Sequence, residues 1–322
     1  MQICSNYLGI LHSKYILVFE MVCNTFSTVY QAINSFTSQN YIVKIFHNNV
    51  KSIEEEIKIS KKISESNNPY FIKYIDSSNG DLIFDEVAES KRYIVFENVS
   101  KGDLMKYISK NQTGFSEKIC KFIFYKIVKA IQFLHNLGIC HRNIKIENIL
   151  LDGENYHIKI WDFSLAAIIK NEKGEKILLN KKLKASNYTA PEIIKGYKYD
   201  GEKIDVYSLG ELLFILRTGV YVFKGDINNN LNKKLYQLIK LKKSDIFWNI
   251  LESMPNIKGL SPEFKNLYFQ LVAPNPKDRP NFEEILAGDY LKEINSLNEQ
   301  ELKNYEKEMI KELKHREEIL NL

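Results

Sequence analysis

Residues 141–151 read HRNIKIENILL, and the segments around this stretch decide the fold when they are read in order. A short triplet, DFS at residues 162–164, follows it along the chain. Further motifs stand on both sides: YIVK at 41–44 and Glu56 upstream, then APE at 190–192, DVYSLG at 205–210 and Arg279 downstream. Each motif alone is a weak signal, because short patterns recur by chance. Their order and separation together make a specific one.

The upstream part has the pattern of a β-sheet with one helix. Five segments rich in β-branched and aromatic side chains are expected to be strands: 16–19, 27–32, 41–45, 81–84 and 92–96. Asn79-Gly80 marks a turn before the fourth of them. Residues 51–63 change to a helical period, in which isoleucines alternate with Glu and Lys. The first hundred residues are therefore predicted to form a five-stranded sheet and one helix.

After Gly102 the pattern becomes mostly helical. The expected helices cover residues 116–138, 205–218, 231–251, 262–271 and 281–288. The tail from about Leu291 is dense in Glu and Lys and carries one narrow apolar stripe. Such a tail is either a solvated helix packed on the edge of the domain or a helix for a partner or for self-association. The whole pattern predicts an α+β protein with a strand-rich first part and a helical second part.

Composition excludes several classes of function. The chain has 322 residues, of which 44% are apolar and 26% charged, so a large core can form without disulfides. The net charge is only +5 and no basic block occurs, which argues against nucleic acid as a partner. None of the four cysteines forms a C-x-x-C pair, so we expect no zinc site and a reducing, cytoplasmic setting. No apolar run reaches the ~18 residues of a membrane span.

The ordered motifs resemble the eukaryotic protein kinase family from about residue 15 to residue 292. The resemblance implies a two-lobed α+β fold, with a small β-rich N-lobe that holds one main helix and a larger helical C-lobe. The implied division is an N-terminal extension at 1–14, the N-lobe at 15–98, the C-lobe at 99–292 and a charged helical tail at 293–322. It also implies ATP and Mg²⁺ as cofactors and a protein as substrate or partner.

The resemblance carries roles over to individual residues. Lys44 matches the lysine that holds the α- and β-phosphates, and Glu56 matches its glutamate partner. Asn148 and Asp162 match the two magnesium ligands. Lys145 matches the lysine near the γ-phosphate, which places the chain nearer the Ser/Thr kinases than the Tyr kinases. The remaining nucleotide-binding positions are Val22, Val29, Ile42, the gatekeeper Phe96, the hinge residues Glu97 and Val99, Asp103 near the ribose, and Leu150. Five further matches are expected to be structural: His141, Arg142, Glu192, Asp205 and Arg279, the last paired with Glu192.

The chain departs from the family where the proton acceptor should stand. Asn143 replaces the catalytic aspartate, and a neutral amide does not accept a hydroxyl proton as a carboxylate does. General-base help is typically worth ~10²–10⁴-fold in rate. Other positions also depart from the family pattern. The three glycine positions of the loop hold Val22, Asn24 and Ser27, and Ile42 replaces an alanine that lies against the purine. Ser164 replaces the glycine after Asp-Phe, Ala185 replaces a threonine, and the small Ser60 stands where the family has a large apolar residue.

The activation segment offers no phosphate acceptor before Ser186, because residues 165–184 contain no Ser, Thr or Tyr. These features favour a pseudokinase that acts as a scaffold or allosteric regulator, with ATP and Mg²⁺ bound weakly or not at all. Two alternatives remain open. One is a slow but active Ser/Thr protein kinase that uses the remaining electrostatics, and the other is a kinase-fold enzyme with different phosphate chemistry.

Overall fold

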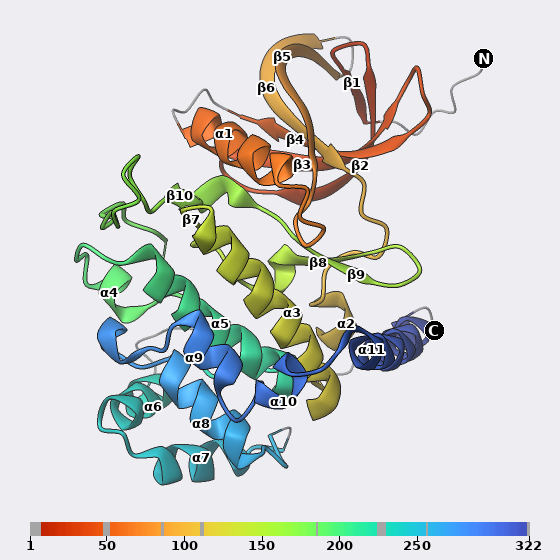
Figure 1. Ribbon diagram of the computed structural model, residues 1–322. Coiled ribbons are helices and arrows are strands. Elements are labelled where there is room, and N and C mark those ends of the chain that lie inside the picture. The colour runs from red at the N-terminus through yellow and green to blue at the C-terminus, as the bar shows by residue number, and fades with distance from the viewer. Residues whose placement is uncertain are drawn as a thin grey trace.

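The computed structural model describes residues 8–47, 52–84, 87–109, 113–184, 186–223, 230–255 and 257–320. Figure 1 shows two lobes, a strand-rich lobe at the top and a larger helical lobe below it. The expected α+β fold with two lobes is confirmed. Among the described residues, no helix has both the length and the apolar character needed to cross a membrane.

The small lobe is built around one antiparallel sheet that closes on itself in the order β1-β2-β3-β4-β6-β5. Its elements are β1 (Gly9–Leu11), β2 (Tyr15–Cys23), β3 (Ser27–Asn34), β4 (Asn40–Phe46), α1 (Ser52–Glu65), β5 (Tyr74–Phe84) and β6 (Val87–Glu97). The side chains of β4 alternate between the sides of the sheet, so that Ile42 packs in the core shared with the large lobe while Val43 and Ile45 pack in a separate small-lobe core.

Two predictions for this lobe are wrong. The described residues give six strands rather than five, because Gly9–Leu11, within the expected N-terminal extension, pairs with both β2 and β5. Three residues are too few to show an alternating pattern. The expected turn at Asn79-Gly80 instead lies inside β5, where Gly80 pairs with Lys91. A Cβ on Gly80 would lie 2.7 Å from the Cβ of His12, so this glycine makes room for a close neighbour.

The large lobe surrounds α5 (Gly201–Thr218), which is buried along nearly its whole length. The Asp200 side chain accepts a hydrogen bond from the Glu202 backbone at its start, and Gly219 ends it at φ 75°. The other helices are α2 (Lys106–Ser109), α3 (Glu117–Asn136), α4 (Pro191–Ile194), α6 (Asn230–Lys240), α7 (Ser244–Glu252), α8 (Pro262–Leu271), α9 (Phe282–Ala287), α10 (Lys292–Asn295) and α11 (Glu299–Leu320). The single helix expected over 231–251 is thus divided, and Lys242 between α6 and α7 has a left-handed φ of 54°.

Short strands and turns line the side of the large lobe that faces the sheet. They are β7 (Ile139–Cys140), η1 (Ile146–Asn148), β8 (Ile149–Asp152), β9 (His157–Ile160), η2 (Phe163–Leu165) and β10 (Ala167–Ile168). The stretch 141–151 therefore runs from the end of β7 through η1 into β8. This arrangement places the HRNIKIEN residues opposite β3, β4 and α1.

The charged tail is a helix that packs on the edge of the domain, which is the first of the two alternatives that the sequence left open. Figure 1 shows α11 beside α2 and the far end of α3. Met309 and Leu313 are fully buried there. Arg316 is also buried, and its guanidinium donates to the backbone oxygens of Tyr107, Thr113 and Gly114. A buried arginine with these partners fixes the helix more firmly than its narrow apolar stripe alone would.

Candidate active site

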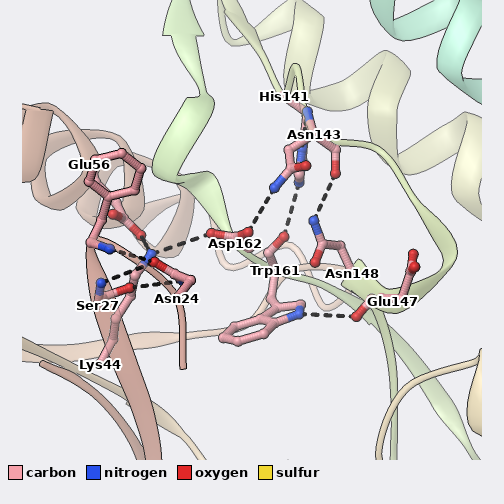
Figure 2. Close-up of polar contacts among 11 residues, drawn as sticks. Asn24, Ser27, Lys44, Glu56, His141, Asn143, Glu147, Asn148, Trp161 and Asp162 are labelled. Atoms are coloured by element: carbon pink, nitrogen blue, oxygen red, sulfur yellow. Dashed lines mark hydrogen bonds and ion pairs between the residues drawn. The ribbon is translucent and has the colours of Figure 1, made fainter. Parts of the chain in front are cut away.

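Three charged side chains from different elements meet between the lobes. The Nζ of Lys44 on β4 lies 2.6 Å from Oε1 of Glu56 on α1 and 3.3 Å from Oδ1 of Asp162 (Figure 2). Burial lowers the pKa of Lys44, but the charges of Glu56 and Asp162 outweigh burial and raise it above its ordinary value. The lysine is therefore a fixed cation. The contact between Lys44 and Glu56, which the sequence could not establish, is present.

Asp162 stays ionised although it is largely enclosed. Burial raises the pKa of its carboxyl, but the Lys44 charge and the Ser164 hydroxyl act against burial and leave the pKa below its ordinary value. Its backbone has a left-handed φ of 63°, which turns the side chain toward Lys44 and Asn143. An ionised carboxylate beside a lysine is a suitable ligand for a magnesium ion.

Asn143 contacts Asp162 directly. Its Nδ2 donates to Oδ2 of Asp162 over 2.7 Å, as Figure 2 shows. A carboxylate only accepts hydrogen bonds, so the amide must present its NH₂ group to it. Asn148 in turn donates from its Nδ2 to the backbone oxygen of Asn143 over 2.8 Å. The substituted base position thus belongs to a hydrogen-bonded chain that includes both expected metal ligands.

Lys145 lies beside this chain. It lines a pocket of about 300 Å³ together with Asn143 and residues of the activation segment, and its charge contributes to the lowered pKa of Asp162. Of the departures expected near the catalytic loop, Ala185 lies outside the described residues.

The loop between β2 and β3 uses its backbone amides internally. Oδ1 of Asn24 accepts hydrogen bonds from the backbone nitrogens of Phe26, at 2.9 Å, and Ser27, at 3.1 Å. The Asn24 nitrogen also donates to the Ser27 oxygen, which closes a tight turn. Val22 is 48% exposed at the end of β2. The amides that a glycine-rich loop would turn toward phosphate are therefore already bonded to Asn24, a role that its position alone did not reveal.

The side chains expected around the purine are covered. Val29, Ile42 and Leu150 are exposed by 3%, 1% and 5%, and Val99 by 9%. Phe96 at the gatekeeper position is 2% exposed and pairs across the sheet with Ile42. A purine would need these apolar surfaces, and little of them is exposed.

Two polar hinge-side residues have other partners. The Glu97 carboxylate pairs with Lys159 at 2.6 Å, and the Glu97 backbone nitrogen donates to the Lys73 oxygen. Asp103, expected near the ribose, accepts a hydrogen bond at its Oδ1 from the backbone nitrogen of Lys106. Burial raises the pKa of Asp103 above its ordinary value.

A column of rings connects the lobes behind the site. The ring centroid of Phe163 lies 6.1 Å from that of Phe71 and 5.3 Å from that of His141. Asp205 supports the base of the column by accepting from the backbone nitrogens of His141 and Arg142. Ser60 is buried, and its hydroxyl has no hydrogen-bond partner among the residues that the structure describes, so a small polar group occupies an apolar position on α1.

The expected pairing of Arg279 with Glu192 is present. Arg279 forms a bidentate pair with Glu192, with nitrogen–oxygen distances of 2.7 and 2.8 Å. Both side chains are buried, and the pair joins α4, which contains the glutamate of APE, to the loop before α9.

Arg142 is fully engaged by the activation segment. Its guanidinium donates to the backbone oxygens of Leu165 and Ala166 and, over 3.0 Å, to the hydroxyl of Tyr199. That hydroxyl donates onward to the Lys181 oxygen over 2.8 Å. Tyr199 therefore gives the Arg142 guanidinium an acceptor without any phosphate on the segment. Sequence reasoning missed Tyr199, because no local pattern connects it to Arg142.

Comparisons with known proteins agree with this geometry. A family profile described as "Protein kinase domain" matches residues 24–291. The chain is 30% identical over 270 residues to "CBL-interacting serine/threonine-protein kinase 15" of Arabidopsis thaliana, an alignment that covers 83% of this chain and 58% of the relative. It is 28% identical over 291 residues to "CBL-interacting protein kinase 26" of Oryza sativa subsp. japonica, covering 90% of this chain and 54% of the relative.

A yeast relative is similar over a shorter part of its length. "Probable serine/threonine-protein kinase HSL1" of Saccharomyces cerevisiae is 34% identical over 252 residues, which are 77% of this chain and 14% of that protein. The chain thus spans little more than half the length of the two plant relatives. The matched family, the two-lobed fold and the Lys44–Glu56–Asp162 cluster lead to one conclusion: this chain belongs to the protein kinase domain family.

Proposed function

We propose that this domain is a pseudokinase that acts as a scaffold or allosteric regulator of a protein partner. The observation that carries the proposal is the hydrogen bond from Asn143 to Asp162. It puts a neutral amide at the position of the proton acceptor and uses that amide to occupy an oxygen of the expected metal ligand. Residue 143 therefore does not supply a general base, and its amide satisfies one oxygen of Asp162 from within the protein.

Weak binding of Mg-ATP is part of the proposal. At the phosphate end the residues fit the group, since Lys44 would hold phosphate oxygens while Asp162 and Asn148 would hold magnesium. When bound, the nucleotide supplies the phosphoryl group and the metal offsets its charge. At the purine end Ile42 fills the space, and at the loop Asn24 holds the amides of Phe26 and Ser27. Binding must break these contacts, which reduces affinity.

A regulatory role also draws support from the activation segment. Arg142 and Tyr199 hold this segment in place without a phosphate, so we expect its surface to stay constant rather than to be switched by phosphorylation. A constant surface suits a domain that binds a partner. We assign the domain to a reducing, cytoplasmic compartment, because Cys23, Cys120 and Cys140 are free thiols.

A slow Ser/Thr protein kinase is the second candidate. The ion pair of Lys44 with Glu56, the ionised Asp162 and the nearby Lys145 favour it, since phosphoryl transfer depends mainly on positioning and charge. The Arabidopsis and yeast relatives are named as serine/threonine kinases, and by analogy this chain would transfer the γ-phosphate of ATP to protein hydroxyls.

Two measurements separate the candidates. The first is transfer from radiolabelled ATP to generic protein substrates, compared with Lys44→Ala. The scaffold proposal expects no difference, and clear turnover that disappears in Lys44→Ala would establish the kinase. The second is a thermal shift with ATP and Mg²⁺. A ligand at one hundred times its Kd adds ~2.7 kcal/mol to stability. A shift that appears only at millimolar ATP supports weak binding, and no shift there removes the binding claim.

A further inference from the structure

A groove of about 1210 Å³ lies in the large lobe, away from the nucleotide site. Its walls come from the segment after α4, from the loop at 273–278 and from α6, α7 and α8. The last three helices lie at the end of the large lobe farthest from the small lobe (Figure 1). Apolar side chains supply much of its lining, among them Tyr236, Ile239, Trp248 and Phe269. The volume is about four times that of the pocket beside Lys145, which is about 300 Å³. A groove this large and open suits a polypeptide segment better than a small metabolite.

Two basic turns border the groove. Residues 195–198 read KGYK and residues 240–243 read KLKK, and neither turn contains an acidic residue. All five lysines of the two turns are exposed, and Lys195, Lys240 and Lys242 line the groove. Among the residues that the structure describes, only Lys242 of these five forms an ion pair, with Asp278 at 3.9 Å.

The acidic residues of the groove do not cancel this charge. Glu192 is held by Arg279 and is buried, and Asp278 faces Lys242. Asp245 remains without a basic partner of its own in the described part of the chain. Lys265 on the opposite wall is paired with Glu252 at 2.8 Å. The two turns therefore leave a surplus of positive charge at the mouth of an apolar groove.

Large apolar side chains stand exposed within the same two turns. Tyr197 is 64% exposed between Lys195 and Lys198, and Leu241 is 62% exposed between Lys240 and Lys242. Ile194 and Ile246 next to these turns are 49% and 48% exposed. Single exposed apolar residues are ordinary, but a set of them around one groove with a charged rim is typical of a protein-binding site.

We infer that this groove docks an acidic segment of a partner protein, with one or two large apolar residues seated in the groove and carboxylates facing the two lysine turns. The apolar lining supplies burial for the anchors, and the lysines supply charge complementarity and faster encounter. The inference is independent of whether the nucleotide site is active, since no residue of that site lines the groove.

The test is selection of a random twelve-residue peptide library, displayed on phage, on the immobilised full chain. Enriched peptides are expected to be acidic and to contain aromatic or Leu-like residues. Their affinity, measured by fluorescence polarisation, should fall at least about tenfold in Lys195→Glu/Lys240→Glu. It should also fall in Tyr197→Ser/Leu241→Ser, which removes the apolar rim without changing the charge, and it should weaken as salt rises.

The matched control is Lys311→Glu/Lys314→Glu, which makes the same change of charge at exposed positions on α11. Peptide affinity should not change in this variant. The inference fails if no peptide is enriched, if the enriched peptides are not acidic, or if the groove variants bind them as tightly as the parent. It also fails if a single-stranded oligonucleotide of twelve nucleotides binds the two turns as tightly as the best peptides do, because the site would then be a general binding surface for polyanions.

Discussion

The side-chain amide of Asn143 donates a 2.7 Å hydrogen bond to Oδ2 of Asp162, whose other oxygen lies 3.3 Å from Nζ of Lys44. The carboxylate is thus held between an ammonium and an amide, both of them groups of the protein. An aspartate at residue 143 would instead face Asp162 with like charge, which a cation between them or a raised pKa of one carboxyl would relieve. This relationship makes the metal dependence of the site the first property to measure.

Asn143→Asp should make the stability of the protein depend on Mg²⁺. Without the metal, the variant loses a hydrogen bond to a charged group, worth about 1.5–3 kcal/mol, and gains repulsion between two carboxylates. We therefore expect the Tm to fall by several degrees in EDTA and to recover in millimolar MgCl₂. Asn143→Ala is the control at the same position, because it removes the hydrogen bond without adding charge. Equal responses of both variants to Mg²⁺ would contradict this account of the pair.

Restoring the carboxylate alone should not restore phosphoryl transfer. Asn24 still binds the loop amides and Ile42 still fills the purine side. We expect transfer from radiolabelled ATP to remain at background in Asn143→Asp and to rise only when Asn24→Gly and Ile42→Ala are added. Strong transfer by the single variant would mean that the base was the only missing part.

Ile42→Ala should improve nucleotide binding while it reduces stability. The substitution opens a cavity beside Val29 and Leu150, where the purine is expected, at a cost of about 2–5 kcal/mol. The nucleotide then fills part of that cavity, so we expect its Kd to fall at least about tenfold in a titration with a fluorescent ATP analogue.

Ile45→Ala is the matched control for this change. Ile45 lies on the same strand and is 2% exposed, but it packs in the separate small-lobe core on the other side of the sheet. It should lose similar stability and gain no affinity. If both variants bind nucleotide equally, Ile42 is not what closes the purine site.

The sequence predicted which residues would meet in the site better than what they would do there. The resemblance of YIVK, Glu56 and DFS to the kinase motifs implied that Lys44, Glu56 and Asp162 serve one site, and the structure adds the Lys44–Glu56 contact that the sequence could not establish. It did not reveal the amide cap made by Asn24 or the partnership of Tyr199 with Arg142, since these depend on local turn geometry and on contacts between distant segments. The strand Gly9–Leu11 and the position of Gly80 inside β5 also depend on pairing between distant segments, so the sequence did not predict them.

Tyr199→Phe should loosen the activation segment. The hydroxyl bonds both the Arg142 guanidinium and the Lys181 oxygen, and a hydrogen bond to a charged group contributes about 1.5–3 kcal/mol. Local opening should therefore become at least about tenfold more frequent. Trypsin cleavage after Lys181 or Lys182, followed by mass spectrometry, measures this directly. Tyr197→Phe, at a residue 64% exposed, is the control. Unchanged cleavage in Tyr199→Phe would show that Arg142 does not depend on the tyrosine.

Glu211→Gln should change how stability depends on pH. Glu211 is 2% exposed on α5, accepts a hydrogen bond from the Tyr268 hydroxyl at 3.2 Å, and has its pKa raised by burial to about 8. Its folded pKa is above the unfolded value, so its contribution to stability is intact below about pH 4.5 and is lost as pH rises through about 8. The full loss is of order 5 kcal/mol above that range, from a difference of about 3.5 pKa units at about 1.4 kcal/mol each.

The glutamine keeps an acceptor for Tyr268 but does not ionise, so the stability of the variant relative to the parent should increase as pH rises. The measurement is the Tm of both proteins from pH 5 to pH 9, in which the difference between them isolates residue 211 from every other titrating group. We expect the two curves to lie close together at pH 5 and to separate progressively above it, with the variant more stable. Parallel curves would mean that the carboxyl is not buried in its neutral form, and that α5 admits water at this point.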